Sequence, residues 1–201
     1  MTEKVINGLP EMLKAHISTL ERVSRDTTNK VSMCESRLKV VHFDKIPKVF
    51  AHDKGWSSLP SSNDALYIAA DGSWYFIEFK NGSIDKSDIF KKLYDSLLMM
   101  LETGVLQDFQ FVRDHVCYIL VYNTEKYPRV QKSESRSRNY EYIMKRANQE
   151  ERLFDVDKFE GYLFQRTCTY SRERFVENFV RVMESLERQE NDSRQALFAD
   201  R

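Results

Sequence analysis

The chain has 201 residues, enough to bury a hydrophobic core without disulfides or a structural metal, and we expect a single domain over residues 1–201. Lysine plus arginine and aspartate plus glutamate each total 31, so any surface that binds nucleic acid must be a local patch. The three cysteines are far apart in sequence, which argues against a disulfide framework and a zinc knuckle. With no signal-like segment and no long apolar run, we expect a cytoplasmic protein without a membrane span.

The first 50 residues are expected to be mostly helical. Apolar residues at helical spacing predict an amphipathic helix over residues 9–20, with Pro10 in its first turn. Residues 29–50 are ambiguous and could form a helix that ends near Lys39, followed by an extended piece. Residues 51–63 have the composition of a loop.

Residues 65–80 form the clearest pattern, with two β-rich runs around Asp71-Gly72, a strong hairpin signal. The second run, "SWYFIEFKNG", carries Glu78 and Lys80 among residues that a sheet would bury. Side chains alternate along a strand, so these two charges share one face. Burying charged side chains in a sheet core costs free energy. Their presence at the end of this strand therefore indicates a functional role.

The rest of the chain alternates between helices and strands. The predicted elements are a helix over 83–104, a strand over 114–123, a polar loop and helix over 133–154, a strand over 161–170 and a C-terminal helix over 171–190. Apolar strands separated by helices imply a three-layer α/β/α domain with a mixed central sheet of about four to five strands. We expect its core to span residues 60–170.

The chemistry of the hairpin involves a third charged residue. Asp64 begins the first strand, so it would approach Glu78 at the open end of the hairpin. Two opposed carboxylates repel, and a hard divalent cation turns that repulsion into a binding site. Lys80 would add positive charge where negative charge develops in a reaction. This set of residues suits metal-assisted attack of water on a phosphodiester.

The spacing of Asp64, thirteen intervening residues and then Glu78-Phe79-Lys80 resembles the PD-(D/E)XK nuclease superfamily, which has the restriction-endonuclease-like fold. The proline of that pattern is not adjacent, since Pro60 lies four residues before the aspartate. The resemblance implies that Asp64, Glu78 and the backbone carbonyl of Phe79 bind Mg²⁺ or Mn²⁺. It also implies that Lys80 is catalytic and that the substrate is nucleic acid, and we expect DNA.

Two further features follow from the resemblance. Many members of the superfamily add a glutamate from the N-terminal region, for which Glu35 is the first candidate. The other candidates are Glu21 and Glu11. Many members also carry a lysine or glutamine and then a tyrosine on the helix after the motif, where this chain has Lys91, Lys92 and Tyr94. The sequence leaves open which lysine faces the site.

A basic and aromatic segment around Arg136 and Arg138 is a candidate nucleic-acid-binding region, or else a solvated loop before a helix. The function that rivals a nuclease is a non-catalytic module of the same fold that binds nucleic acid or protein.

Whether Asp64 and Glu78 lie on the same face of the hairpin depends on the length of its loop. A two-residue Asp71-Gly72 loop would pair Asp64 with Phe79 and place Asp64 on the face opposite Glu78. A three-residue loop over residues 70–72 brings Asp64 level with Glu78, and Gly72 suits the left-handed conformation that closes such a loop. We therefore predict the three-residue loop, or a bulge with the same effect on register.

Overall fold

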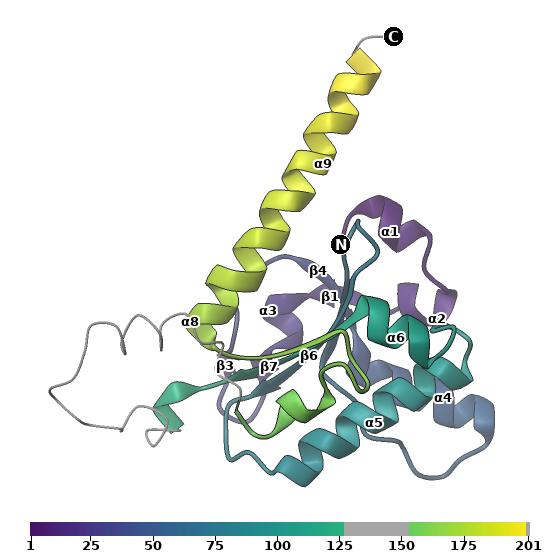
Figure 1. The fold of residues 1–201 in the computed structure, drawn as a ribbon, viewed down its shortest axis with the longest axis vertical. Coiled ribbons are helices and arrows are strands. Elements are labelled where there is room, and N and C mark those ends of the chain that lie inside the picture. Colours follow the sequence, from purple (N-terminus) through teal and green to yellow (C-terminus); the bar gives the residue numbers. More distant parts are fainter. Residues whose placement is uncertain (127–152, 200–201) are drawn as a thin grey trace, which may run out of the picture.

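The computed structural model describes residues 1–126 and 153–199, and these form a mixed α/β structure around a six-stranded sheet (Figure 1). The strand order is β1-β4-β5-β6-β7-β8. The strands are β1 Ile17–Thr19, β4 Lys39–His42, β5 Ala65–Ile68, β6 Trp74–Lys80, β7 Val116–Tyr122 and β8 Arg166–Ser171. Neighbours from β1 to β6 pair antiparallel, whereas β6, β7 and β8 are parallel, so the sheet is mixed as predicted. The prediction of four to five strands was too low.

The N-terminal region is not mostly helical, and this prediction was wrong. Its helices are short: α1 Glu3–Asn7, α2 Glu11–Lys14, α3 Leu20–Val23 and, after the 3₁₀ turn η1 Phe43–Lys45, α4 Ile46–Lys54. Between them lie β1, β4 and a separate two-stranded ribbon, β2 Arg25–Asp26 and β3 Val31–Ser32. β-branched residues of β1 and β4 pair edge to edge, Ile17 opposite Val41, and this tertiary pairing overrides the local helical pattern. The sheet therefore extends outside the predicted core of residues 60–170.

Where the structure describes the second half of the chain, the predicted helices and strands are confirmed in kind, with shifted boundaries. The helix over 83–104 is α5 Lys86–Glu102, and the strands over 114–123 and 161–170 are β7 and β8. Helix α6 Phe109–His115 was not predicted. Two 3₁₀ turns, η2 Thr124–Lys126 and η4 Val156–Phe159, complete this part of the structure. Most of the predicted loop and helix over 133–154, including Arg136 and Arg138, lies outside the described residues.

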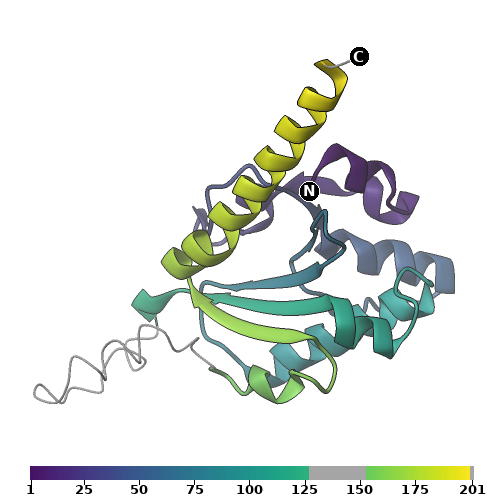
Figure 2. The ribbon, with the colours of Figure 1, turned by 45° about the horizontal axis from the view of Figure 1, so that its top comes forward.

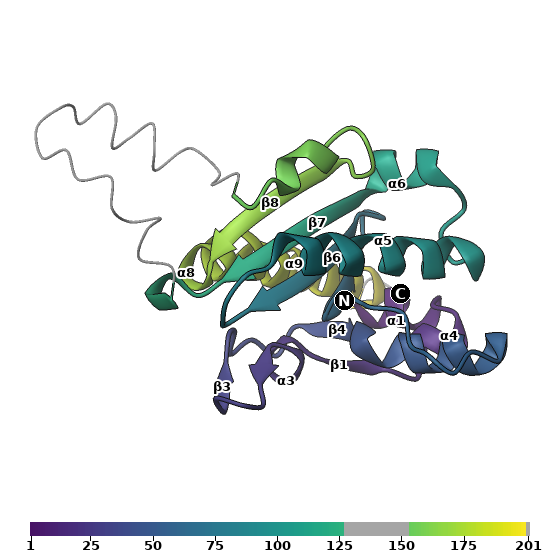
Figure 3. The same ribbon diagram turned by 90° about the horizontal axis from the view of Figure 1, so that it is seen from below.

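Helices pack on both faces of the sheet, which fits a layered α/β arrangement (Figure 3). On one face, side chains of α5 contact the charged end of β6. On the other face lies the C-terminal helix, made of α8 Arg172–Phe175, the π-helical turn η5 Val176–Val180 and α9 Arg181–Ala199. Its Phe175 and Phe179 place their rings 5.6 and 5.1 Å from those of Phe79 and Tyr75.

The C-terminal helix continues past the predicted end at residue 190, and α9 extends away from the sheet (Figure 2). Two inner strands of the sheet, β5 and β7, are buried along their whole length, as the apolar run of β7 predicts. Within the described residues, no helix combines the length and the apolar character needed to cross a membrane.

The hairpin between β5 and β6 has the predicted three-residue loop. The Ala69 N–H donates to the Ser73 carbonyl at 2.8 Å, and pairing runs from Ile68 opposite Trp74 to Ala65 opposite Ile77. Gly72 closes the loop with φ +91°. This register places Asp64, the residue before β5, level with Glu78.

Candidate active site

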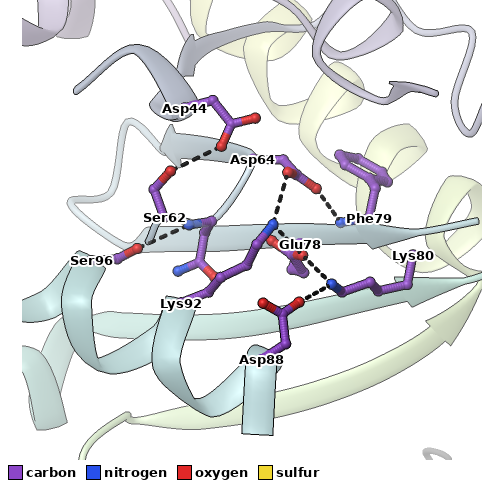
Figure 4. Close-up of polar contacts among 10 residues, drawn as sticks. Asp44, Ser62, Asp64, Glu78, Phe79, Lys80, Asp88, Lys92 and Ser96 are labelled. Atoms are coloured by element: carbon purple, nitrogen blue, oxygen red, sulfur yellow. Dashed lines mark hydrogen bonds and ion pairs between the residues drawn. The ribbon is translucent and has the colours of Figure 1, made fainter. Parts of the chain in front are cut away.

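Glu78 is the buried centre of the candidate site (Figure 4). Its Oε1 accepts a hydrogen bond from Lys92 Nζ at 2.7 Å, and Lys80 Nζ lies 3.3 Å from the same oxygen. Its Oε2 is buried and has no hydrogen-bond partner among the described residues. Burial, and then the nearby Asp64 carboxylate, raise the pKa of Glu78 despite the two lysines.

Asp64 reaches the same place from the neighbouring strand. Its Oδ2 accepts a hydrogen bond from the Phe79 N–H at 2.6 Å, and its Oδ1 lies 3.6 Å from Lys92 Nζ. Burial raises the pKa of Asp64, and the positive charge of Lys92 offsets part of this effect. Because the N–H and the carbonyl of one strand residue point to the same strand edge, the Phe79 carbonyl also faces the side on which Asp64 lies.

Helix α5 supplies one row of polar side chains to this site, Asp88, Lys92 and Ser96, spaced four residues apart (Figure 4). Asp88 Oδ2 lies 2.5 Å from Lys80 Nζ, and Ser96 Oγ accepts the buried Asn63 N–H at 2.9 Å. Burial alone would lower the pKa of Lys92, but the carboxylates of Asp64 and Glu78 raise it above the ordinary lysine value. The helix thus holds an ammonium group between the two carboxylates.

Lys80 points along the same face of β6 as Glu78, as the alternation of side chains predicts. Its side chain is 16% exposed, so the ammonium group lies at the boundary between the core and solvent. Burial lowers its pKa, whereas Glu78 and Asp88 raise it, and the net shift is upward. Lys80 is therefore held in its charged form next to the carboxylates.

The structure resolves the choice between the two neighbouring lysines. Lys92 contacts both carboxylates, whereas Lys91 is exposed and lies outside the cluster. Tyr94 is 41% exposed and packs edge-on against Phe159, with ring centroids 5.6 Å apart. Of the three α5 residues named from the sequence, the structure places only Lys92 at the site.

Glu35 does not join the site. It is exposed and lines a separate cavity of about 520 Å³ together with residues of the C-terminal helix, because the chain before β4 runs beside that helix. A different cavity, of about 230 Å³, is lined by Asp64 and Phe79. Asp44 lines the same cavity and adds a further carboxylate near Asp64. Asp44 accepts a hydrogen bond from Ser62 Oγ at 2.9 Å.

Three residues of the site were not identified from the sequence. Ser96 had a detectable signal, because it is a polar residue on the otherwise apolar buried stripe of α5. Asp88 lies in the first helical turn, where acidic residues are common for reasons unrelated to a site. Asp44 comes from a short 3₁₀ turn with no pattern to distinguish it.

Among the described residues, no group of three or more His, Cys, Asp or Glu side chains is arranged to hold a metal ion. The oxygen donors at the site are the Asp64 and Glu78 carboxylates and the carbonyl of Phe79. The chain matches no protein-family model, no curated protein and no solved structure.

Proposed function

We propose that this protein is a divalent-metal-dependent nuclease with the restriction-endonuclease-like fold, and that it hydrolyses phosphodiester bonds in DNA. The observation that carries the proposal is the convergence of Asp64, Glu78 and Lys80 at the ends of two paired strands, in the register that the motif requires. The mixed sheet and the helices on its two faces are compatible with this fold.

The oxygen donors suit Mg²⁺ or Mn²⁺, which prefer carboxylate and carbonyl ligands. Glu78 Oε2 supports this view, because a buried carboxylate oxygen without a hydrogen-bond partner costs free energy unless something binds it. Asp64, Glu78 and the Phe79 carbonyl would hold the ion. When bound, the cation would lower the pKa of a coordinated water and neutralise phosphoryl oxygens.

The two lysines have different parts in this proposal. Lys80, held by Asp88 at the solvent boundary, is placed to donate hydrogen bonds to a phosphate oxygen on which negative charge develops. Lys92 lies deeper, between Asp64 and Glu78, and compensates their charges. The lysine at the solvent boundary would thus act on the substrate, and the deeper one would offset part of the rise in the pKa of both carboxyl groups and hold them in place.

One observation favours the alternative, a non-catalytic module of the same fold. Lys92 already lies 2.7 Å from Glu78 and 3.6 Å from Asp64, so the cluster forms ion pairs without any added cation. A site of this kind could serve only to hold the ends of β5 and β6 together.

A cleavage assay separates the two functions. Supercoiled plasmid, linear duplex, single-stranded DNA and RNA are each incubated with the protein in Mg²⁺, Mn²⁺, Ca²⁺ or EDTA. The proposal predicts cleavage of DNA in Mg²⁺ or Mn²⁺ and none in EDTA. Binding without cleavage in every metal would support the alternative, and cleavage that persists in EDTA would contradict the proposed mechanism.

A further inference from the structure

The β2–β3 ribbon, residues 25–32, forms a small arm beside the candidate site. Asp26 organises its turn: the Thr28 and Asn29 N–H groups donate to Oδ1 at 2.9 and 3.0 Å, and Asn29 Nδ2 donates to Oδ2 at 2.6 Å. Lys30 completes the turn with φ +55°. The turn therefore has a defined conformation, set by one carboxylate.

The arm is attached directly to the end of β6. Asn81, which follows Lys80, donates from Nδ2 to Asp26 Oδ2 at 2.8 Å. Asn81 in turn accepts a hydrogen bond from Asn123 Nδ2 at 2.8 Å, and both asparagines are buried. The arm consequently has a fixed position relative to Lys80 and Glu78.

A second contact holds the other strand of the arm. The guanidinium of Arg172, at the start of α8, donates to the carbonyls of Ser32 and Met33 at 3.1 and 3.4 Å. The arm is therefore tied both to the sheet and to the C-terminal helix, and it is not a free loop.

The cavity of about 230 Å³ lies between this arm and the site, because Arg25, Asp26 and Thr27 line it together with Asp64 and Phe79. Among the described residues that line it, Arg25 is the one cationic side chain, and the carboxylates of Asp26, Asp44 and Asp64 surround the same space. Arg25 is exposed and makes no hydrogen bond or ion pair through its side chain within the described part of the chain. Its guanidinium is thus available to a ligand.

We propose that Arg25, presented by the β2–β3 arm, binds a backbone phosphate of the nucleic acid next to the one cleaved at Asp64, Glu78 and Lys80. This inference rests on the proposed nuclease function. A guanidinium donates two parallel hydrogen bonds to phosphate oxygens and keeps its charge at any working pH. Its charge offsets part of the repulsion that the three carboxylates lining the cavity would exert on the phosphate backbone. Arg25 then contributes to substrate binding, while Lys80 acts at the reacting phosphate.

The test compares Arg25→Gln with Arg22→Gln, an exposed arginine of α3 that does not line the cavity. Affinity for a labelled DNA duplex is measured by fluorescence anisotropy in Ca²⁺ at several salt concentrations, and urea midpoints show that both variants are folded. Arg25→Gln should weaken binding by about tenfold and reduce the slope of log K against log[salt] by about one, the value for one lost phosphate contact. Its single-turnover rate at saturating DNA should stay within about threefold of wild type, since Lys80 is intact. Arg22→Gln should match wild type.

The outcomes separate this inference from the proposed function. If wild type cleaves DNA but Arg25→Gln keeps the wild-type affinity and salt slope, Arg25 does not bind the backbone and the nuclease assignment stands. If both arginine variants weaken binding equally, the effect is one of general charge, and the inference is likewise wrong. Failure of wild type to cleave any substrate overturns the proposed function itself.

Discussion

The Lys92 ammonium group lies 2.7 Å from Glu78 Oε1 and 3.6 Å from Asp64 Oδ1, so one helical lysine bridges two carboxylates from adjacent strands. Glu78 is fully buried and the side chain of Lys92 is 21% exposed, so solvent screens this pair only weakly. The mutual repulsion expected for the opposed carboxylates is thus partly offset within the protein, and several measurable properties depend on this arrangement.

Replacing Lys92 should destabilise the metal-free protein. Lys92→Met removes the ion pair of Asp64 and leaves Glu78 with Lys80 alone, 3.3 Å from its Oε1, and breaking a buried pair costs roughly 3–5 kcal/mol. We expect a loss of about 3 kcal/mol, near the low end, because Glu78 can take up a proton. Urea denaturation in EDTA measures this, with the exposed neighbour Lys91→Met as the control. Equal unfolding free energies for the two variants would show that the bridge contributes nothing.

The same variant should respond more strongly to metal. Removing the ammonium group from between Asp64 and Glu78 removes a competing cation, so Mg²⁺ should stabilise Lys92→Met by more than it stabilises wild type. The comparison uses urea midpoints with and without 10 mM-scale Mg²⁺, roughly a saturating concentration for a weak site. An identical response of the two proteins would mean that these carboxylates do not bind the ion.

The raised pKa of Glu78 predicts a pH dependence of stability. Between the ordinary glutamate value of 4.5 and the raised folded-state value, the folded protein keeps a proton that the unfolded chain has released. The stabilisation from this proton is fully present below pH 4.5 and is lost as pH rises through the folded-state pKa. Denaturation of metal-free wild type across pH 4.5 to 8 should therefore show a decline that Glu78→Gln reduces. Equal slopes for the two proteins would place the titrating group elsewhere.

The loop that sets the register should be sensitive at Gly72. Its φ of +91° is a conformation that residues with a Cβ rarely adopt, although an added Cβ would meet no atom within 4 Å. Gly72→Ala should cost about 1–2 kcal/mol through backbone strain alone. Gly82→Ala is the matched control, because it is equally open but has no positive φ; it should change stability by less than about 0.5 kcal/mol. Thermal unfolding of both variants decides this, and equal effects would refute the argument from φ.

Ser96 should matter to stability although it contacts no charged residue of the site. Its Oγ accepts the Asn63 N–H at 2.9 Å, and both residues are fully buried. Ser96→Ala leaves that N–H unpaired, which costs about 1–3 kcal/mol. The exposed Ser87→Ala on the same helix is the control, with an expected change below about 0.5 kcal/mol. A loss in the control as large as that of Ser96→Ala would indicate a general effect on α5.

The hairpin shows how much of the site could be predicted from sequence. The spacing of Asp64 and Glu78 and the alternation along a strand required a three-residue loop, and the structure has it. The N-terminal strands could not be predicted in this way. β1 has only three residues, and its conformation depends on pairing with the distant strand β4, as when Ile17 pairs with Val41.

The helical side of the site was only partly predictable for a similar reason. Lys92 borders the buried stripe of α5, whereas Lys91 lies on the exposed side of the helix, and the carboxylates that Lys92 contacts lie on other segments. Asp44 is brought near Asp64 by a 3₁₀ turn that follows β4, so its position depends on the sheet that the local sequence does not predict.

The most direct measurement of the central claim is the single-turnover rate of DNA cleavage in Mg²⁺ by wild type, Glu78→Gln, Lys80→Met and the control Lys86→Met. Lys86 is exposed and forms its ion pair with Asp155, not with Asp64 or Glu78. We predict that wild type and Lys86→Met cleave at similar rates, and that Glu78→Gln and Lys80→Met lose at least about 10²-fold while keeping cooperative unfolding. Wild-type rates in purified, folded Glu78→Gln or Lys80→Met would contradict the assignment of this site as the catalytic centre.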